Sequence, residues 1–395
     1  MKWEKKSIRE FADVFDGPHA TPKESINGPV FLGIKNIKPE GGIDLTDIRH
    51  ISDSEYEKWT KRVTPKKDDI VLSYEATLHR YAIIPDSFVG CLGRRMALVR
   101  VDENKVYYKF LYYTFLSDTW RGFIDANKLT GATVDRISIT DFPSYFINFP
   151  PLPTQHRISS ILSAYDDLIE NNLKRIKLLE ETAFLSYKGI VRNEKSLIKY
   201  PLAEIATVTS SKRIFLSDYV EDGVPFYRSK EIIAKSNFES IDKPLYITEG
   251  RYNDIKIKFG IPVNGDLLIT AVGTIGFIHL VNEDDGEFYF KDGNLIWIRN
   301  ITNRELVYFL FFKFRTKEFR EMLNSVAIGS SQKALTIETV KKIEIEIPSN
   351  DSLIEFNNET KTIIKLIYNL QNQNTKLREA RDILLPRLMS GEIEV

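Results

Sequence analysis

The sequence has one cysteine, no long apolar run and no excess of charge of either sign, and each shortage excludes a class of protein. Cys91 stands alone in 395 residues, so the chain cannot form an internal disulfide. No Cys/His pair has the spacing of a structural zinc site, which favours a reducing, cytoplasmic setting. The longest apolar run, residues 306–312, is far shorter than the roughly 20 residues of a membrane span. The first residues lack a signal-peptide stretch, so we expect a soluble protein without membrane contact.

Charge is balanced, with 55 Lys and Arg residues against 55 Asp and Glu residues. Residues 1–200 hold 30 basic and 27 acidic side chains, and residues 201–395 hold 25 and 28. This excludes a uniformly basic nucleic-acid coat, so any phosphate binding must depend on local clusters. The composition, 43% hydrophobic and 28% charged, is typical of a folded protein with enough mass for two or three domains.

The chain repeats itself at a displacement of about 198 residues. Four segments of the first half align with four of the second, and the last pair leads in each half into an alternating strand ending in proline. A repeat of this length is a duplicated domain rather than a solenoid, whose units span about 20 to 50 residues. We expect two α+β domains with pseudo-twofold symmetry. The aligned segments are 7–14 with 201–208, 67–72 with 264–269, 109–116 with 308–314, and 131–137 with 329–335.

A long helix is predicted after each globular half. Following the proline-rich residues 150–153, Thr154 is the expected N-cap, and its helix runs towards Pro201; the second is closed by Pro386 and Gly391. Apolar positions step by four and three, which is a coiled-coil signal. About 40 residues span about 60 Å, so an antiparallel pair would act as a spacer with one domain at each end. The seam positions are Ile158, Leu162, Tyr165, Ile169, Asn172, Ile176, Leu179 and Ala183, then Phe356, Thr360, Ile363, Ile367, Leu370, Asn374 and Leu377.

Each predicted seam contains one asparagine, Asn172 or Asn374. Buried, these amides would penalise wrong registers, because they find partners in only one alignment. The alternative is that the helix face turns to solvent at that point. The expected boundaries are domain 1 over 1–153, a central helix over 154–199, domain 2 over 200–350 and a C-terminal helix over 351–395.

Motifs for catalysis are missing. There is no G-x-x-x-x-G-K-[ST] phosphate loop, no H-E-x-x-H and no paired C-x-x-C. Residues 148–151 superficially resemble an adenine methyltransferase motif, but the order is wrong and the repeat partner, residues 346–349, abandons it. We therefore expect no catalytic residue, no metal and no cofactor in this chain. The five histidines lie far apart without a triad pattern: His19, His50, His79, His156 and His279.

These features together resemble the specificity (S) subunit of type I DNA restriction-modification systems, over essentially the whole chain. The most specific segments are residues 149–158 (FPPLPTQHRI), 168–181 (LIENNLKRIKLLEE) and 384–393 (LLPRLMSGEI). In the second half, residues 273–276 (GTIG) and 329–333 (GSSQK) look like recurrent target-recognition turns of the family. In the first half, residues 75–78 (EATL) replace the first turn and 131–134 (GATV) are a looser version of the second.

The resemblance implies that each half is a target recognition domain reading one part of a bipartite, asymmetric site in double-stranded DNA. It further implies two methyltransferase (M) subunits docked on the helices, carrying S-adenosylmethionine chemistry at adenine N6. Restriction (R) subunits would supply ATP- and Mg-dependent translocation and cleavage, while this chain stays noncatalytic. The alternative is a two-headed coiled-coil scaffold for protein interactions, without DNA specificity.

Candidate DNA-binding residues are turn-borne side chains that match base edges, with Arg or Lys suited to guanine and Asn or Gln to adenine. Most contacts in such interfaces go to phosphate, so a residue more often positions the protein on DNA than reads a base. The alternative for each residue is simple solvent exposure. Gly131 and Gly329 are candidates for phosphate-binding turns, or are simply loop turns. The other candidates are Lys35, Asn36, Ser73, Tyr74, Thr77, Arg94, Arg95 and Thr133 in the first half, and Arg228, Ser229, Lys230, Thr274, Lys291, Ser331, Gln332 and Lys333 in the second.

Overall fold

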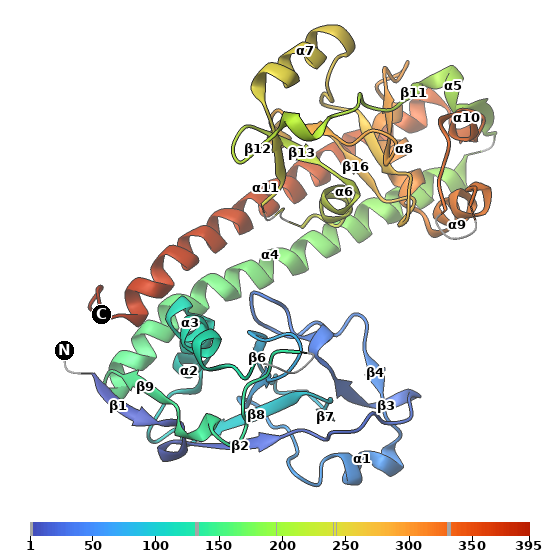
Figure 1. The fold of residues 1–395 in the computed structure, drawn as a ribbon. Helices are drawn as coiled ribbons and strands as arrows, with labels where there is room; N and C mark the ends of the chain where they lie inside the picture. Colours follow the sequence, from blue (N-terminus) through green and yellow to red (C-terminus); the bar gives the residue numbers. More distant parts are fainter. Residues whose placement is uncertain (1–2, 131–133, 195, 240, 242, 330–332) are drawn as a thin grey trace. The chain divides into compact units, whose positions relative to one another are not determined.

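The computed structural model describes residues 3–130, 134–194, 196–239, 241, 243–329 and 333–395. The chain forms two compact units (Figure 1). Unit 1 contains Met1–Leu168 and Leu377–Val395, and unit 2 contains Ile169–Lys376. Within the described residues, no helix is both long enough and apolar enough to cross a membrane.

A four-stranded antiparallel sheet lies at the centre of each unit. Its inner strands β5 and β15 are buried throughout, because helices and a second sheet cover them, and this explains their continuous apolar sequence. The repeat predicted from the sequence is therefore present in the strand order. In unit 1 the order is β2 (Ala12–Asp16), β8 (Met96–Val101), β5 (Ile70–Ser73) and β6 (Tyr81–Ile83); in unit 2 it is β11 (Thr207–Thr209), β18 (Leu295–Arg299), β15 (Leu267–Thr270) and β16 (Ile278–Leu280).

A smaller second sheet in each unit contains one parallel strand pair, β3 with β7 in unit 1 and β13 with β17 in unit 2. A separate two-stranded pair, β1 with β9 or β10 with β19, precedes each long helix. The strands are β1 (Glu4–Ser7), β3 (Ser25–Leu32), β4 (Arg49–His50), β7 (Gly90–Leu92), β9 (Phe146–Phe149), β10 (Ile198–Pro201), β12 (Tyr219–Val220), β13 (Val224–Tyr227), β14 (Leu245–Ile247), β17 (Tyr289–Phe290) and β19 (Glu344–Ile347).

Aromatic helices pack on the central sheets. Phe110 and Phe115 of α2, like Phe309 and Phe314 of α8, are almost fully buried in the main core of their unit. The shorter helices are α1 (Asp53–Trp59), α2 (Tyr108–Leu116), α3 (Asp118–Asn127), α5 (Leu202–Ile205), α6 (Ser229–Ser236), α7 (Glu249–Phe259), α8 (Leu306–Arg315), α9 (Lys317–Val326) and α10 (Ile337–Lys341).

The two long helices are α4 (Leu152–Asn193) and α11 (Asn350–Met389). The prediction of Thr154 as N-cap was wrong, because α4 already begins at Leu152. Pro153 is tolerated there since the first helical N–H groups have no partner within the helix. Pro386 does not end α11 either, but lies inside its last turn. Its neighbours Leu384, Leu385 and Leu388 pack into the core of unit 1, which holds the helix in place.

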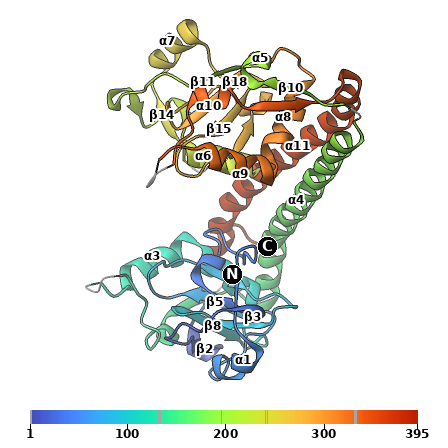
Figure 2. The same cartoon turned by 90° about the vertical axis from the view of Figure 1, so that its right-hand side faces the viewer.

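The helices pair antiparallel, as predicted. In unit 2, Asn172 Nδ2 donates to Asn374 Oδ1 at 2.9 Å, and Ser186 donates to Glu359 at 3.0 Å. Residue numbers rise along one helix while those of the partners fall along the other (Figure 1 and Figure 2). Both asparagines are buried and paired, which confirms the seam interpretation and rules out the solvent-facing alternative.

Cys91 lies on β7, opposite Phe31 of β3 in the parallel pair, and its side chain is fully buried. Burial raises the pKa of this thiol to about 12, because the thiolate would lose its hydration. The single thiol is therefore a packing residue.

Candidate nucleic-acid interface

In each half, the first turn that the sequence singled out is hydrogen-bonded to the described residues at the end of the second turn and just after it. In unit 2, the Leu335 N–H donates to the Ala271 carbonyl at 2.8 Å, and the Gly273 N–H donates to the Lys333 carbonyl at 3.2 Å. In unit 1, Ile137 donates to Tyr74 at 2.7 Å and Ala76 to Asp135 at 3.0 Å. We call each set a turn pair: residues 74–79 with 134–137 in unit 1, and residues 271–276 with 333–335 in unit 2.

Backbone conformation shows which residues of the two turns correspond. Gly273 and Gly276 have φ angles of 75° and 86°, and Ala76 and His79 have 71° and 62°. The segment equivalent to 273–276 is therefore 76–79, so the alignment of 75–78 with this turn was wrong by one residue. The left-handed conformation is retained although both glycines are replaced, and for non-glycine residues it is unfavourable.

In each unit, a buried hydroxyl group forms a hydrogen bond with the backbone in or next to the first turn. The Ser73 hydroxyl donates to the Thr77 carbonyl, and the Thr270 hydroxyl accepts from the Phe277 N–H at 3.0 Å. Both side chains are completely inaccessible to solvent. Thr77 and Thr274, at equivalent positions, are exposed. Each turn pair thus presents a threonine on a fixed backbone, a geometry suited to meeting a base edge or a phosphate.

The other predicted residues of unit 1 differ in exposure and in their contacts. The exposed Lys35 pairs with Asp47 at 2.7 Å, whereas Asn36 is buried, with its amide donating to the Asp44 and Asp47 carbonyls. The Asn36 side chain thus shapes a loop and has no free amide for a base. Tyr74 is also buried.

The neighbouring arginines of unit 1 differ from each other. Arg94 is exposed. Arg95 has a φ of 71° and forms an ion pair with Glu75 at 3.0 Å. This pair places the Arg95 guanidinium beside the turn pair of unit 1.

In unit 2, Arg228 forms an ion pair with Glu231 at 3.0 Å, and its N–H donates to the same carboxylate. Burial alone would raise the pKa of Glu231, but the contacts with Arg228 outweigh it and lower that pKa. Arg228 therefore caps the start of α6, where Ser229 is the first residue. Among the predicted residues of this unit, the exposed cations are Lys230, whose Nζ lies 3.5 Å from Glu231, and Lys291 and Lys333.

Gly329 has a φ of 115°, which a side-chain-bearing residue rarely adopts, so the turn requires glycine. Gly131, Thr133, Ser331 and Gln332 lie outside the described residues.

Two basic residues near the unit 1 turn pair were missed by the sequence reasoning. Lys128 forms ion pairs with Asp125 and Asp135, and the backbone of the exposed Arg136 forms isolated β-bridges with Glu75 and Leu129. Contacts with both aspartates raise the pKa of Lys128, so it stays charged. The available signal was their position immediately flanking the predicted turn at 131–134.

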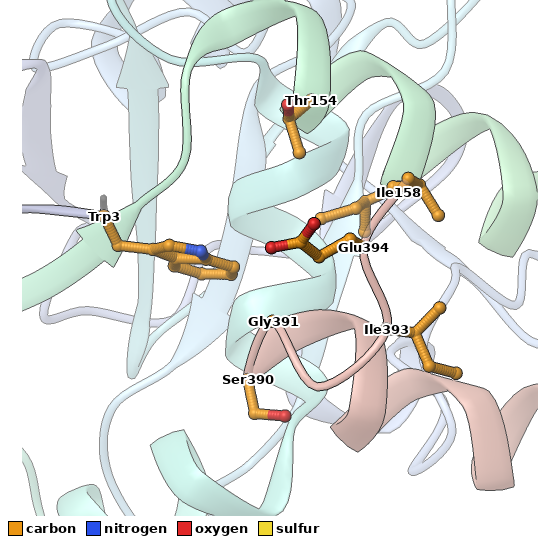
Figure 3. Close-up of a pocket in the computed structure, with 8 residues that line it drawn as sticks. Trp3, Thr154, Ile158, Ser390, Gly391, Ile393 and Glu394 are labelled. Atoms are coloured by element: carbon orange, nitrogen blue, oxygen red, sulfur yellow. The ribbon is translucent and has the colours of Figure 1, made fainter. Parts of the chain in front are cut away.

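Pockets do not offer a competing site. One of about 120 Å³ lies where Trp3 faces the loop Ser390–Glu394 beside Thr154 and Ile158 (Figure 3). Another, of about 420 Å³, is lined by Trp120, Phe123 and Phe146 among others. Neither contains a predicted site residue, and the described residues hold no cluster of three or more His, Cys, Asp or Glu side chains suited to a metal ion.

Comparison with known proteins agrees with the duplicated architecture. The family model described as "Type I restriction modification DNA specificity domain" matches residues 1–181 and again 196–384. A type I restriction enzyme specificity subunit, MjaIX of Methanocaldococcus jannaschii, is 25% identical, with 100% of this chain and 94% of the relative covered. A putative type I specificity subunit of Haemophilus influenzae is 26% identical over 62% of this chain and 61% of its own.

A solved structure has the same fold. The crystal structure of a type I restriction-modification S subunit from M. genitalium superposes with a TM-score of 0.58 at 18% sequence identity, covering 98% of this chain and 96% of that one. Since the family model accounts for both halves, the chain belongs to the type I restriction-modification DNA specificity subunit family.

Proposed function

We propose that this chain selects a bipartite, asymmetric DNA site, with one target recognition domain in residues 1–153 and a second in residues 200–350. The chain is noncatalytic and acts in the cytoplasm as the specificity subunit of an adenine-N6 methyltransferase and restriction endonuclease. Each turn pair contacts one part of the site, and the long helices α4 and α11 set the gap between the parts.

One observation carries this proposal: both units build the same turn pair from the same backbone hydrogen bonds, but apart from the shared threonine, Thr77 or Thr274, the side chains on it differ. A conserved frame with variable exposed groups suits two readers of different half-sites. Thr77 and Arg136 of the turn pair, with the neighbouring Lys128, are the proposed contacts from unit 1, and Thr274 and Lys333 are those from unit 2. The positive φ of Gly329 supports a phosphate-binding turn.

Partners supply the chemistry in this proposal. Two M subunits dock along α4 and α11 and bring S-adenosylmethionine, and R subunits bring ATP and Mg. The balanced charge of the chain supports such a division, because a weakly charged reader gains little from counterion release and needs partner contacts to the DNA backbone. The chain then chooses the site, and its partners help to hold it.

Mapping of methylated adenines tests the proposal. A host that lacks related systems should gain one bipartite methylated motif when it expresses this chain together with its M subunit. Without this chain, or with this chain alone, the motif should be absent. If the methylated motif persists without this chain, the chain is not the specificity subunit. If the chain binds M subunits but no motif is methylated, the protein-scaffold alternative is supported.

A matched pair of variants assigns each half of the motif. We expect Thr77→Ala to relax one half-site only and Thr274→Ala to relax only the other, because the two residues occupy equivalent turns. Lys333→Ala should weaken binding across sequences and reduce the salt slope by about 1, as expected for loss of one phosphate contact. Equal effects of both threonine variants on both half-sites would contradict the assignment of one reader to each unit.

A further inference from the structure

The two long helices are repeat-related, but their polar seam residues are not. α4 begins at residue 152 and α11 at residue 350, so Asn172 corresponds to Leu370, and Asn374 corresponds to Ile176. All four side chains are buried. Each helix therefore has one asparagine and one aliphatic residue at these two positions, but in opposite order.

The observed antiparallel pairing brings polar groups to polar groups. Asn172 Nδ2 donates to Asn374 Oδ1 at 2.9 Å, and Asn374 Nδ2 donates to the Ile169 carbonyl at 3.5 Å. Ile176 and Leu370 belong to the apolar core of the same unit. Both amides are thus paired within a hydrophobic seam.

The same opposite order recurs at the end of the helix pair that lies in unit 1. Asp166 of α4 accepts from Arg381 Nη1 of α11 at 2.7 Å and from the Tyr113 hydroxyl at 2.6 Å. The Arg381 side chain is 12% exposed and also contacts its neighbour Asp382. The repeat-related residues in unit 2 are all apolar and buried: Ile364 for Asp166, Ala183 for Arg381 and Phe311 for Tyr113.

Pairing of two identical helices in this register would break both contacts. If α4 met the α4 of a second chain, Asn172 would face Ile176 and Asp166 would lie beside Ala183. If α11 met another α11, Asn374 would face Leu370 and Arg381 would lie beside Ile364. A buried amide or charge placed against an aliphatic side chain loses its partner and is strongly unfavourable.

We propose that these two polar contacts make the helix pair heterotypic, so that α4 pairs with α11 and rejects a second copy of itself. α4 leaves the ribosome before α11 is made, and its apolar seam could otherwise capture the α4 of a neighbouring chain. Heterotypic pairing therefore keeps one copy of each unit in every helix pair.

Substitutions in the intact chain recreate the mismatched contacts. Asn172→Leu places leucine opposite Asn374, as in two paired α11 helices, and Asn374→Ile places isoleucine opposite Asn172, as in two paired α4 helices. We expect each variant to lower the urea midpoint. The double variant should recover at least the wild-type midpoint, because its seam then matches the Ile176 and Leu370 contacts. Additive losses in the double variant would overturn the proposal.

Assembly is tested with all residues present. A protease site inserted between Asn193 and Ile198 is cut after folding, which leaves two chain halves held together. ¹⁵N-labelled and unlabelled samples are then mixed in urea at a concentration below the unfolding midpoint. Native mass spectrometry identifies the complexes that form. Heterotypic complexes of intermediate mass show that the halves exchange. We expect only heterotypic complexes from the wild-type sequence at that point. Homotypic complexes approaching their statistical half share would overturn the proposal.

A variant with repeat-related residues at every polar position completes the test: Asn172→Leu, Asn374→Ile, Asp166→Ile, Arg381→Ala and Tyr113→Phe. After the same exchange, we expect homotypic complexes to appear, because the two seams no longer differ at these positions. If this variant stays heterotypic while its halves exchange, other residues determine the pairing and the proposal is wrong.

Discussion

At the scale of single residues, Gly276 of the unit 2 turn pair has a steric role as well as a conformational one. A Cβ added to Gly276 would lie 3.0 Å from Cγ of Arg320, and the φ of 86° is unfavourable for any side chain. We expect Gly276→Ala to destabilise the protein by about 1 kcal/mol or more, measured by urea unfolding. Gly250→Ala, on α7 in the same unit, is the control, since an added Cβ meets nothing within 4 Å there and should cause no loss.

A second prediction concerns the buried His279 of unit 2. Its Nε2 lies 2.8 Å from Asp285 Oδ2, and Lys235 forms an ion pair with the other carboxylate oxygen. Burial lowers the pKa of His279. Burial alone would raise the pKa of Asp285, but His279 and Lys235 outweigh it and hold that pKa below its ordinary value.

Both pKa shifts make the folded state less stable as the pH falls. Below about pH 6.5 the unfolded chain protonates His279 more readily than the folded chain does, and below about pH 4 the same holds for Asp285. Stability should therefore be full above pH 6.5 and fall as the pH decreases. In urea titrations from pH 7 to pH 5, His279→Asn should flatten this decline. A decline as steep as that of the wild-type chain would contradict the role of His279.

At the scale of elements, helices and core strands were predictable because their periodicity extends over many residues and occurs twice. Both seams were read correctly from spacing alone. Helix ends were not, since Pro153 occupies the first turn of α4, where its missing N–H would have no partner within the helix. Pro386 lies inside the last turn of α11, where core packing of Leu384, Leu385 and Leu388 holds the helix despite the lost hydrogen bond. The correct alignment of the unit 1 turn was also hidden, because Ala76 and His79 adopt a conformation for which the sequence offers no glycine.

Long-range partners of the candidate site were less predictable still. The contact between residues 76 and 135 and its equivalent between 273 and 333 depend on how loops meet in space, which local patterns do not encode. The burial of Asn36 was invisible for the same reason, since the carbonyl groups that hold it follow 8 and 11 residues later in an irregular loop.

An element-scale prediction uses the register of the helix pair. Removing residues 172–178 from α4 together with 368–374 from α11 deletes seven residues opposite seven, because the Asn172–Asn374 contact sets the register. Each helix shortens by about 10 Å. We expect the recognised gap to shrink by about three base pairs, or methylation to be lost, in the adenine-methylation assay. An unchanged gap would contradict the proposed spacer, and removal of 172–178 alone is the out-of-register control.

At the scale of the whole molecule, duplication and divergence have separate roles. Sheet order, aromatic helices and turn backbones are common to the two units, while exposed turn residues and polar seam residues differ. The balanced total charge fits this division, because recognition then depends on a few placed side chains instead of a general attraction to phosphate. Changes to exposed turn residues should therefore alter sequence preference without altering stability.

The buried position of Cys91 makes the native protein a ready substrate for site-specific fluorescence labelling. Its thiol is inaccessible and has a pKa of about 12, so maleimide dyes should leave the folded wild-type chain unmodified and react only after unfolding. Cysteines introduced at the exposed Thr77 and Thr274 would then carry a donor and an acceptor without removal of the native thiol. Energy transfer between them would follow the separation of the two reading turns in solution as DNA and partner subunits are added.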